Sequence, residues 1–270
     1  MVAADLNATV INKEEIAPGL IILQVRPDEE LPGFKAGQFT TLGLPGAAPR
    51  FEIADQEDTP PPADKLIRRA YSISSSSEQK NYLEFYITLI RSGALTPRIF
   101  ALNEGDRIFV AKKITGVFTL DDAPYEHNLI LVATGTGLAP YMSMVRTIFS
   151  KQTHRKYAII HGARHSWDLG YKAELDTLAT YFPNFAYLPV ISRPDEEHTS
   201  WTGAAGYVQD QWSGGAVEKA WGLKPGPENS SIFLCGAPAM IEGMITLLTS
   251  QGFKEKTRKE PGEVFAEKFW

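Results

Sequence analysis

The chain has 270 residues, and its 27 Lys and Arg against 32 Asp and Glu give it a net charge of −5. Apolar residues make up 43% of the chain and aromatic residues 11%, which is enough to pack a core and excludes a wholly disordered chain. The mild negative charge argues against a nucleic-acid partner. The only cysteine, Cys235, excludes an internal disulfide and an iron–sulphur cluster held by cysteines alone.

At about 150 residues per domain, the length allows one large domain or two of ordinary size. The sequence has no apolar run long enough to span a membrane, and it does not begin with the basic and apolar stretches of a secretory signal. We therefore expect a cytoplasmic protein with no membrane partner.

The first half of the chain has the pattern of an antiparallel β structure. Short runs rich in β-branched and aromatic residues are separated by turn residues, which suggests a small sandwich or barrel. The predicted strands are residues 20–25, 39–44, 71–75, 83–90 and 107–111. Residues 95–102 are predicted to be a helix, with Thr96 as its N-cap and Pro97 as its first helical residue.

The second half alternates apolar strands with amphipathic helices, which is typical of a parallel sheet with crossover helices. The predicted order is strand 128–133, helix 139–149, strand 157–161, helix 169–178, strand 185–191, helix 208–220, strand 231–234, helix 240–250 and a last strand near the C-terminus. We place the boundary near residues 121–124, which gives domains 1–122 and 123–270. Residues 46–65, rich in Pro and acidic residues, are predicted to be a long exposed loop.

Two glycine motifs follow strands of the second half. Residues 133–140 read Ala-Thr-Gly-Thr-Gly-Leu-Ala-Pro, and glycines between a strand and a helix let the backbone approach a phosphate. The same pattern also forms ordinary tight turns. Residues 235–238 read Cys-Gly-Ala-Pro and place a thiol at the carboxyl end of a strand, where α/β folds bind ligands, although a buried structural cysteine is common.

Two further motifs lie in the first half. Residues 69–75 read Arg-Ala-Tyr-Ser-Ile-Ser-Ser, and on a strand we expect the Arg69 cation, the Tyr71 ring and a serine hydroxyl to point to one face. Arg can hold a phosphate and Tyr can stack on a planar ring. Residues 93–96 read Gly-Ala-Leu-Thr and offer backbone N–H groups at a helix start, as any capped helix also does.

In this order the four motifs resemble those of the ferredoxin–NADP reductase family of flavoenzymes. The ending Ala-Glu-Lys-Phe-Trp, residues 266–270, resembles the bacterial branch of that family. The resemblance implies an N-terminal antiparallel β-barrel that binds FAD, followed by a five-stranded parallel-sheet α/β domain that binds NADP(H).

On the FAD side, the resemblance implies that Arg69 holds the diphosphate, Tyr71 stacks on the isoalloxazine ring and Ser72 lies near its N5. The other residues that it implies around FAD are Ile73, Ser74, Gly93, Ala94, Leu95 and Thr96. In the tail, it implies that Phe265 and Ala266 lie at the flavin and Trp270 at the adenine.

On the NADP side, the resemblance implies that Thr136 and Gly137 line the nicotinamide and diphosphate channel. Cys235 and Gly236 are implied beside the nicotinamide ring, and Ser72, Tyr71 and Cys235 form the implied catalytic set. A 2′-phosphate needs cations, and Arg164 and Arg193, with Ser192 beside it, follow two predicted strands. The further arginine that the family often carries is absent from the segment Thr-Gly-Ala-Ala, residues 202–205.

The implied activity is the transfer of electrons between NADPH and a one-electron carrier, ferredoxin or flavodoxin, through FAD. An acidic carrier would dock on local basic groups, for which Arg68 and the segment from Lys254 to Lys259 are candidates. The reductase component of an oxygenase system, a general NAD(P)H diaphorase and a non-enzymatic flavin sensor are the alternatives. No metal site is expected, because His161 and His165 are four residues apart on a strand-to-turn segment rather than a helix.

Overall fold

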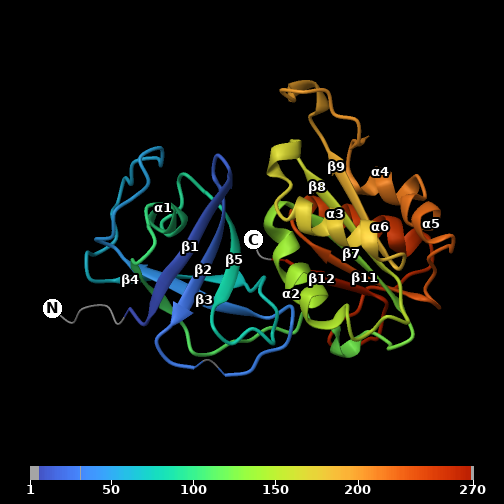
Figure 1. Cartoon of the computed structure of the whole chain (residues 1–270), viewed down its shortest axis with the longest axis horizontal. Coiled ribbons are helices and arrows are strands. Elements are labelled where there is room, and N and C mark those ends of the chain that lie inside the picture. The colour runs from blue at the N-terminus through green and yellow to red at the C-terminus, as the bar shows by residue number, and fades with distance from the viewer. Residues whose placement is uncertain (1–5, 31, 269–270) are drawn as a thin grey trace. The chain divides into compact units, whose positions relative to one another are not determined.

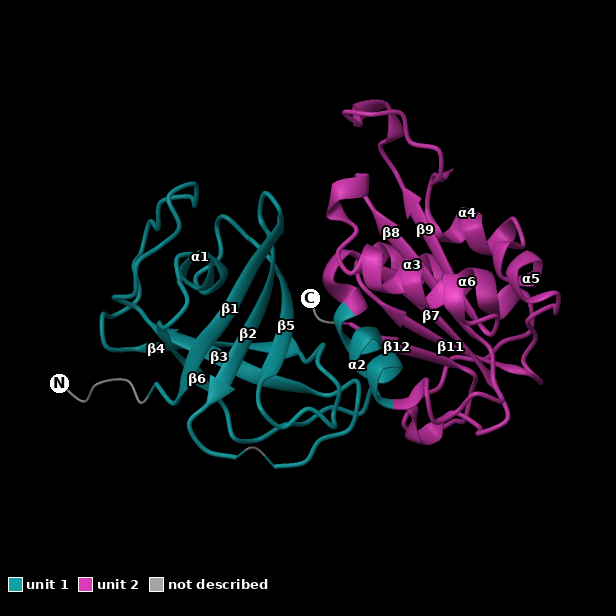
Figure 2. Cartoon of the chain, in the orientation of Figure 1, with its two compact units in different colours: residues 1–119, 139–147 teal, residues 120–138, 148–270 magenta. Residues whose placement is uncertain are grey.

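The computed structural model describes residues 6–30 and 32–268 and divides the chain into two compact units. The first unit comprises residues 1–119 and 139–147, and the second comprises residues 120–138 and 148–270 (Figure 2). The chain therefore passes from one unit to the other at three points. In the described part of the chain, no helix is long and apolar enough to cross a membrane.

The first unit is built on a six-stranded antiparallel sheet with the strand order β4-β3-β6-β1-β2-β5 (Figure 1). The predicted antiparallel fold of this half is confirmed. Its elements are β1 (Ala8–Ala17), β2 (Leu20–Pro27), β3 (Phe39–Pro45), β4 (Leu66–Ser72), β5 (Leu83–Thr88), α1 (Thr96–Phe100) and β6 (Arg107–Val110).

Strand β1 is an element that the sequence pattern did not reveal. Its second half, Lys-Glu-Glu, reads as a polar loop, yet it pairs with β2 in antiparallel register. The strand accommodates the charged Lys13 because the ammonium group donates to the backbone carbonyls of Phe100 (2.8 Å) and Leu102 (2.5 Å) at the end of α1. The alternate residues Ala8 and Val10 enter the core of the unit beside Leu23 and Phe85.

The second unit is built on a six-stranded parallel sheet with the order β10-β9-β8-β7-β11-β12. Its strands are β7 (Asn128–Thr134), β8 (Tyr157–Ala163), β9 (Phe185–Ile191), β10 (Ala204–Ala205), β11 (Ser230–Cys235) and β12 (Val264–Glu267). The predicted parallel α/β fold is confirmed. The sheet has one strand more than the predicted five, because the two residues of β10 pair with the edge of β9 and are too short to leave a periodic pattern.

The helices after β7 are α2 (Ala139–Ile148), α3 (Lys172–Tyr181), α4 (Val208–Ser213), α5 (Ala216–Trp221) and α6 (Pro238–Ser250). The single helix predicted over residues 208–220 is broken in two, because Gly215 adopts a left-handed φ of +69° between α4 and α5. Helices α4, α5 and α6 bury Trp212, Val217 and Met244 against one face of the parallel sheet. Most of α2, residues 139–147, belongs to the first unit.

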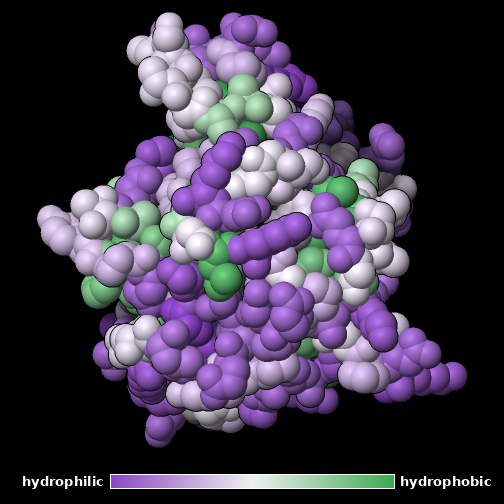
Figure 3. All heavy atoms as spheres, turned by 90° about the vertical axis from the view of Figure 1, so that its right-hand side faces the viewer, coloured by the Kyte–Doolittle hydropathy of each residue, from purple (hydrophilic) through white to green (hydrophobic). Residues whose placement is uncertain are grey.

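The surface shown in Figure 3 is mostly hydrophilic, and its hydrophobic side chains lie in small scattered spots rather than in one patch. Apolar side chains are instead concentrated in the two cores, one for each unit. Each sheet therefore has a rigid core that can hold functional groups at its edge in fixed positions.

Candidate functional site

The two glycine motifs of the second unit touch each other at the carboxyl ends of the adjacent strands β7 and β11. A Cβ atom at Gly137 would lie 2.3 Å from the carbonyl oxygen of Cys235. A Cβ atom at Gly236, whose φ is +146°, would lie 2.2 Å from Thr134 Oγ1. Thr134 Oγ1 also accepts a hydrogen bond from the backbone N–H of Ala237 (2.9 Å). Both glycines are therefore required for the two segments to meet, although Thr134 and Ala237 are 103 positions apart in the chain.

The pair Cys235 and Glu267 lies at the end of strands β11 and β12, which are in parallel register at these residues. Cys235 is fully buried, and burial together with the Glu267 carboxyl raises the pKa of its thiol. Burial also raises the pKa of Glu267 to about 8, and its Oε2 has no hydrogen-bond partner in the described residues. At neutral pH this edge therefore presents an uncharged thiol beside an uncharged carboxylic acid, both able to donate a proton to a hydrogen bond.

Glu267 is a candidate site residue that none of the four sequence motifs contains. The available signal was its position next to Ala266 in a tail already expected to return to the cofactor. Phe265, two residues before it, is buried with its ring stacked on Phe233 at 4.4 Å and 6°. The expected role of Phe265 and Ala266 at the flavin stays a prediction, and Trp270 lies outside the described residues.

His161 is fully buried on β8, and Ala133 of β7 lies between it and Cys235 in the register of the sheet. Burial lowers its pKa to about 4, so the imidazole is neutral at physiological pH. Its Nδ1 lies 3.2 Å from the hydroxyl of Tyr187 on β9. The His161 side chain therefore packs as a neutral group inside the sheet, and it does not form an acid–base pair with Tyr187.

The carboxyl ends of β8 and β9 bring the two predicted phosphate-binding arginines into neighbouring segments. The backbone N–H of Arg193 donates to the Arg164 carbonyl (3.0 Å), and that of Ser192 donates to the Ala163 carbonyl (3.0 Å). The Arg164 side chain is exposed and has no partner in the described chain. The Arg193 guanidinium instead pairs with Glu196, with Nη1 3.3 Å from both carboxylate oxygens.

In the first unit, Arg69, Tyr71 and Ser72 lie at the end of β4. Arg69 donates to the Arg68 carbonyl (2.7 Å) and to no other described group. The Tyr71 ring is half-buried, edge-on to Phe85 at 6.5 Å, and burial raises the pKa of its hydroxyl. The alternation of the strand places Arg69 and Tyr71 on one face and Ser72 on the other. Ser72 Oγ is buried and has no hydrogen-bond partner in the described residues.

The next two residues of the motif, Ile73 and Ser74, form hydrogen bonds within the first unit. Ile73 is fully buried, and its N–H donates to the Gln38 carbonyl (3.1 Å). The N–H of Ser74 donates to the Glu84 carbonyl (2.8 Å), and its hydroxyl donates to the Glu84 carboxylate (3.1 Å). Arg146 on α2 donates to the same carboxylate (2.6 Å), which holds this helix on the first unit.

The predicted N-cap role of Thr96 was wrong. Leu95 precedes the helix, and Thr96 Oγ1 instead accepts from the N–H of Ile90 (3.0 Å) and donates to its carbonyl (3.1 Å). These bonds close a turn around residues 90–96. The N–H of Gly93 is used within the turn by Ile90 (2.8 Å), whereas those of Ala94 and Leu95 have no partner in the described residues.

The long loop of residues 46–65 is clamped against this turn by two arginines and one carboxylate. Arg98 is 2% exposed and grips Glu57 through two bonds, Nη1–Oε1 at 2.8 Å and Nη2–Oε2 at 2.9 Å. It also donates to the Ala94 carbonyl (2.6 Å). Arg50 donates to Glu57 (2.8 Å) and to the Gly93 carbonyl (3.0 Å). The two arginines thereby fix the carbonyls of the turn. The hydrogen bond from Arg98, together with the positive charge of both arginines, lowers the pKa of Glu57.

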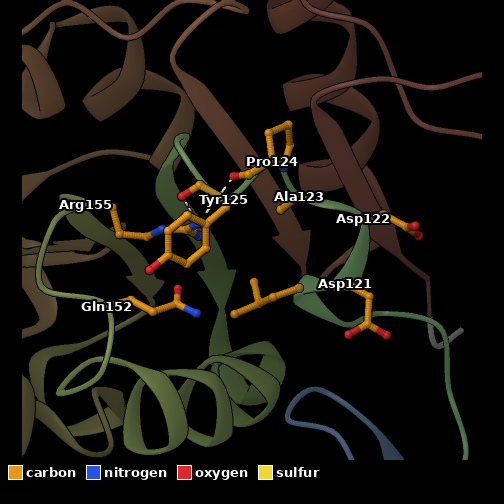
Figure 4. A pocket seen from close by; sticks show the side chains of 8 residues that line it. Asp121, Asp122, Ala123, Pro124, Tyr125, Gln152 and Arg155 are labelled. Carbon is orange, nitrogen blue, oxygen red and sulfur yellow. Dashed lines mark hydrogen bonds between the residues drawn. The ribbon is translucent and has the colours of Figure 1, made fainter.

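A separate cavity of about 460 Å³ lies in the second unit (Figure 4). Its lining residues are Leu120, Asp121, Asp122, Ala123, Pro124, Tyr125, Gln152 and Arg155. Arg155 is buried and donates to the backbone carbonyls of Pro124 and Tyr125, so it holds this connecting segment in place. None of the predicted site residues lines this cavity.

Comparison with known proteins agrees with this geometry. The family model described as an oxidoreductase NAD-binding domain matches residues 131–245. A flavodoxin/ferredoxin–NADP reductase of Buchnera aphidicola is 33% identical over 239 residues, which is 88% of either chain. The chain belongs to the flavodoxin/ferredoxin–NADP reductase family.

A second relative supports the family assignment, and a solved structure supports the fold. The Escherichia coli flavodoxin/ferredoxin–NADP reductase is 31% identical over 88% of either chain. A ferredoxin NADP⁺ reductase of Neisseria gonorrhoeae, solved with bound FAD and NADP, has the same fold, with a TM-score of 0.80 over 97% of either chain at 24% identity.

Proposed function

We propose that this protein is an FAD-dependent reductase that moves electrons between NADPH and ferredoxin or flavodoxin. The observation that carries the proposal is Ser72, which follows the half-buried Tyr71 in β4 and whose buried Oγ has no partner in the described residues. A buried hydroxyl without a partner is costly, and a polar atom of a flavin ring would satisfy it. The residues of this chain therefore fit FAD.

In the proposed FAD site, the first unit holds the cofactor through β4 and the turn before α1. The Arg69 guanidinium, which has unused donors, would bind the diphosphate, and the N–H groups of Ala94 and Leu95 would add to it. Tyr71 would stack on the ring system, while Ile73, Ser74, Gly93 and Thr96 shape the backbone around it. Domains 1–122 and 123–270 remain our proposed division of the two cofactors, with α2 returning to the first unit.

In the proposed NADP(H) site, the second unit offers the interlocked loops at β7 and β11. Thr136 and Gly137 would line the diphosphate, and Gly236 allows the close approach of the loops. Cys235 and Glu267 would form the uncharged wall beside the nicotinamide. Arg164, Arg193 and Ser192 would read the 2′-phosphate at the ends of β8 and β9.

Bound FAD supplies the chemistry, since it accepts a hydride and passes electrons on one at a time. The protein orients the reacting groups and stabilises charge that develops during transfer. Ser72 Oγ would donate a hydrogen bond to the flavin ring. Glu267, protonated below about pH 8, would hold a proton at this edge without bringing a negative charge close to the hydride donor.

The partner of the reductase is a ferredoxin or flavodoxin, and we propose that basic side chains guide its docking. The Arg68 guanidinium is exposed and lies 4.7 Å from the ring centroid of Phe109. In the segment 254–259, Lys256 already pairs with Asp122, whereas Lys254, Arg258 and Lys259 are exposed. The exposed four are therefore the proposed docking cations.

The test is reduction of the purified protein under anaerobic conditions. We expect a flavin absorption spectrum that bleaches promptly when NADPH is added. Ser72→Ala should keep FAD but slow bleaching by about tenfold or more, because a hydrogen bond to the ring is lost. Thr88→Ala, which removes an exposed hydroxyl of the same unit outside the turn of residues 90–96, is the control and should match the wild type. A colourless protein that FAD cannot reconstitute would contradict the proposal.

A further inference from the structure

Glu196 accepts hydrogen bonds from an arginine and a histidine at the ends of β8 and β9. Its carboxylate accepts from Arg193 Nη1 (3.3 Å) and from His165 Nε2 (2.9 Å). These bonds lower the pKa of Glu196 and raise that of His165, so the carboxylate is charged at neutral pH. The Glu196 carboxylate thus occupies the Arg193 guanidinium that an anionic ligand at this edge would also need.

The surroundings fix this arrangement. His165 Nδ1 is 3.2 Å from Asp168, so both ring nitrogens face carboxylates. The Trp167 ring is stacked between His165 (4.4 Å) and His198 (4.8 Å). Because the imidazole is held from two sides, its Nε2 stays directed at Glu196, and moving the carboxylate away breaks two charge-assisted bonds rather than one.

Few cations remain at the ends of β8 and β9 to bind the 2′-phosphate of NADP(H). Arg164 has no partner in the described chain, whereas Arg193 is partly neutralised by Glu196. The neighbouring strand β10 carries Ala204 and Ala205, which supply no further cation. Two anions that share one guanidinium repel each other, whereas a ribose 2′-hydroxyl can donate a hydrogen bond to the same carboxylate.

We propose that Glu196 is a specificity-determining residue that competes with the 2′-phosphate of NADP(H) for Arg193 and so narrows the preference for NADP(H) over NAD(H). The inference rests on the proposed function, because it takes Arg193 as a 2′-phosphate ligand. It predicts that the enzyme also uses NADH, and that removing the charge of Glu196 makes it more selective for NADPH.

The first test is binding of adenosine 2′,5′-bisphosphate and of adenosine 5′-monophosphate, measured by calorimetry on the FAD-loaded protein. Glu196→Gln should raise the ratio of the two affinities by about tenfold in favour of the bisphosphate. Asp195→Asn is the matched control, because it removes the same charge from the same turn and Asp195 has no partner in the described chain. Its ratio should stay close to that of the wild type.

Arg193→Ala, alone and combined with Glu196→Gln, locates the effect. If Glu196 acts through Arg193, the gain from Glu196→Gln disappears in the double variant. In steady-state kinetics the gain should fall on the KM for NADPH, with kcat unchanged. An unchanged affinity ratio in Glu196→Gln, or an equal change in Asp195→Asn, would overturn the inference.

These outcomes are distinguishable from a failure of the proposed function. A wild type that reacts with NADPH and NADH but shows no effect of Glu196→Gln leaves the reductase activity in place and rejects only the role of Glu196. A wild type that binds neither adenosine probe and is reduced by neither nucleotide contradicts both.

Discussion

Glu267 has a carboxyl group whose titration falls near neutral pH, because burial raises its pKa from 4.5 to about 8. The folded protein therefore binds more protons than the unfolded chain between these two values. Stability from this group is full below about pH 4.5 and is lost as the pH rises through about 8. Each unit of pH inside the window costs at most ~1.4 kcal/mol.

Glu267→Gln should remove this dependence, since the amide does not titrate. We expect the free energy of unfolding in urea to change less between about pH 5 and about pH 8 in the variant than in the wild type. Glu255→Gln, an exposed carboxyl in the preceding segment, should keep the wild-type slope. A wild-type slope in Glu267→Gln would show that this carboxyl is not buried in its acid form.

The residues with a motif were predictable from the sequence, but their surroundings were not. Arg69, Tyr71 and Cys235 stand in short recognisable patterns. The missing partner of Ser72 Oγ and the burial of Glu267 depend on which strands pair and in what register. Such long-range pairing leaves no trace in the local sequence pattern.

At the scale of elements, the loop of residues 46–65 is ordered by one carboxylate. Glu57→Ala would leave the 2% exposed Arg98 without its charged partner, which should destabilise the first unit by about 3 kcal/mol. We also expect weaker FAD binding, because Arg50 and Arg98 hold the carbonyls of Gly93 and Ala94. Thermal unfolding and FAD dissociation, followed by flavin fluorescence, measure the two effects.

Glu52→Ala is the control for this prediction, since Glu52 is an exposed glutamate of the same loop. It should leave both the stability and the FAD affinity unchanged. Equal effects of the two substitutions would mean that Glu57 contributes only general charge and that the clamp does not hold the turn.

Helices and strands with a regular hydrophobic period were predicted well from the sequence, and elements without such a period were not. The apolar strands β7 and β9 and the helix α6 were found within a few residues of their bounds. Strand β1 was missed because charged residues fill its second half, and the break between α4 and α5 was missed because a left-handed glycine is invisible to periodicity.

At the scale of the whole molecule, the sequence indicated two different architectures in the right order, and both are present. What it did not indicate is that α2 follows a strand of the second unit but belongs mostly to the first. Its buried residues Tyr141, Met142 and Met144 show an apolar face in the sequence, but an apolar face does not say which core it joins. A bond from Arg146 to Glu84, 62 positions away in the chain, ties α2 to the first unit.

As a reductase of this family, the chain is proposed to convert the two electrons of a hydride into single electrons for a carrier protein. The direct measurement is the number of ferredoxin or flavodoxin molecules reduced per NADPH consumed, under anaerobic conditions with the FAD-loaded protein. We expect two one-electron reductions of the carrier for each NADPH. NADPH oxidation that leaves the carrier oxidised, and proceeds only when dioxygen is admitted, would contradict it.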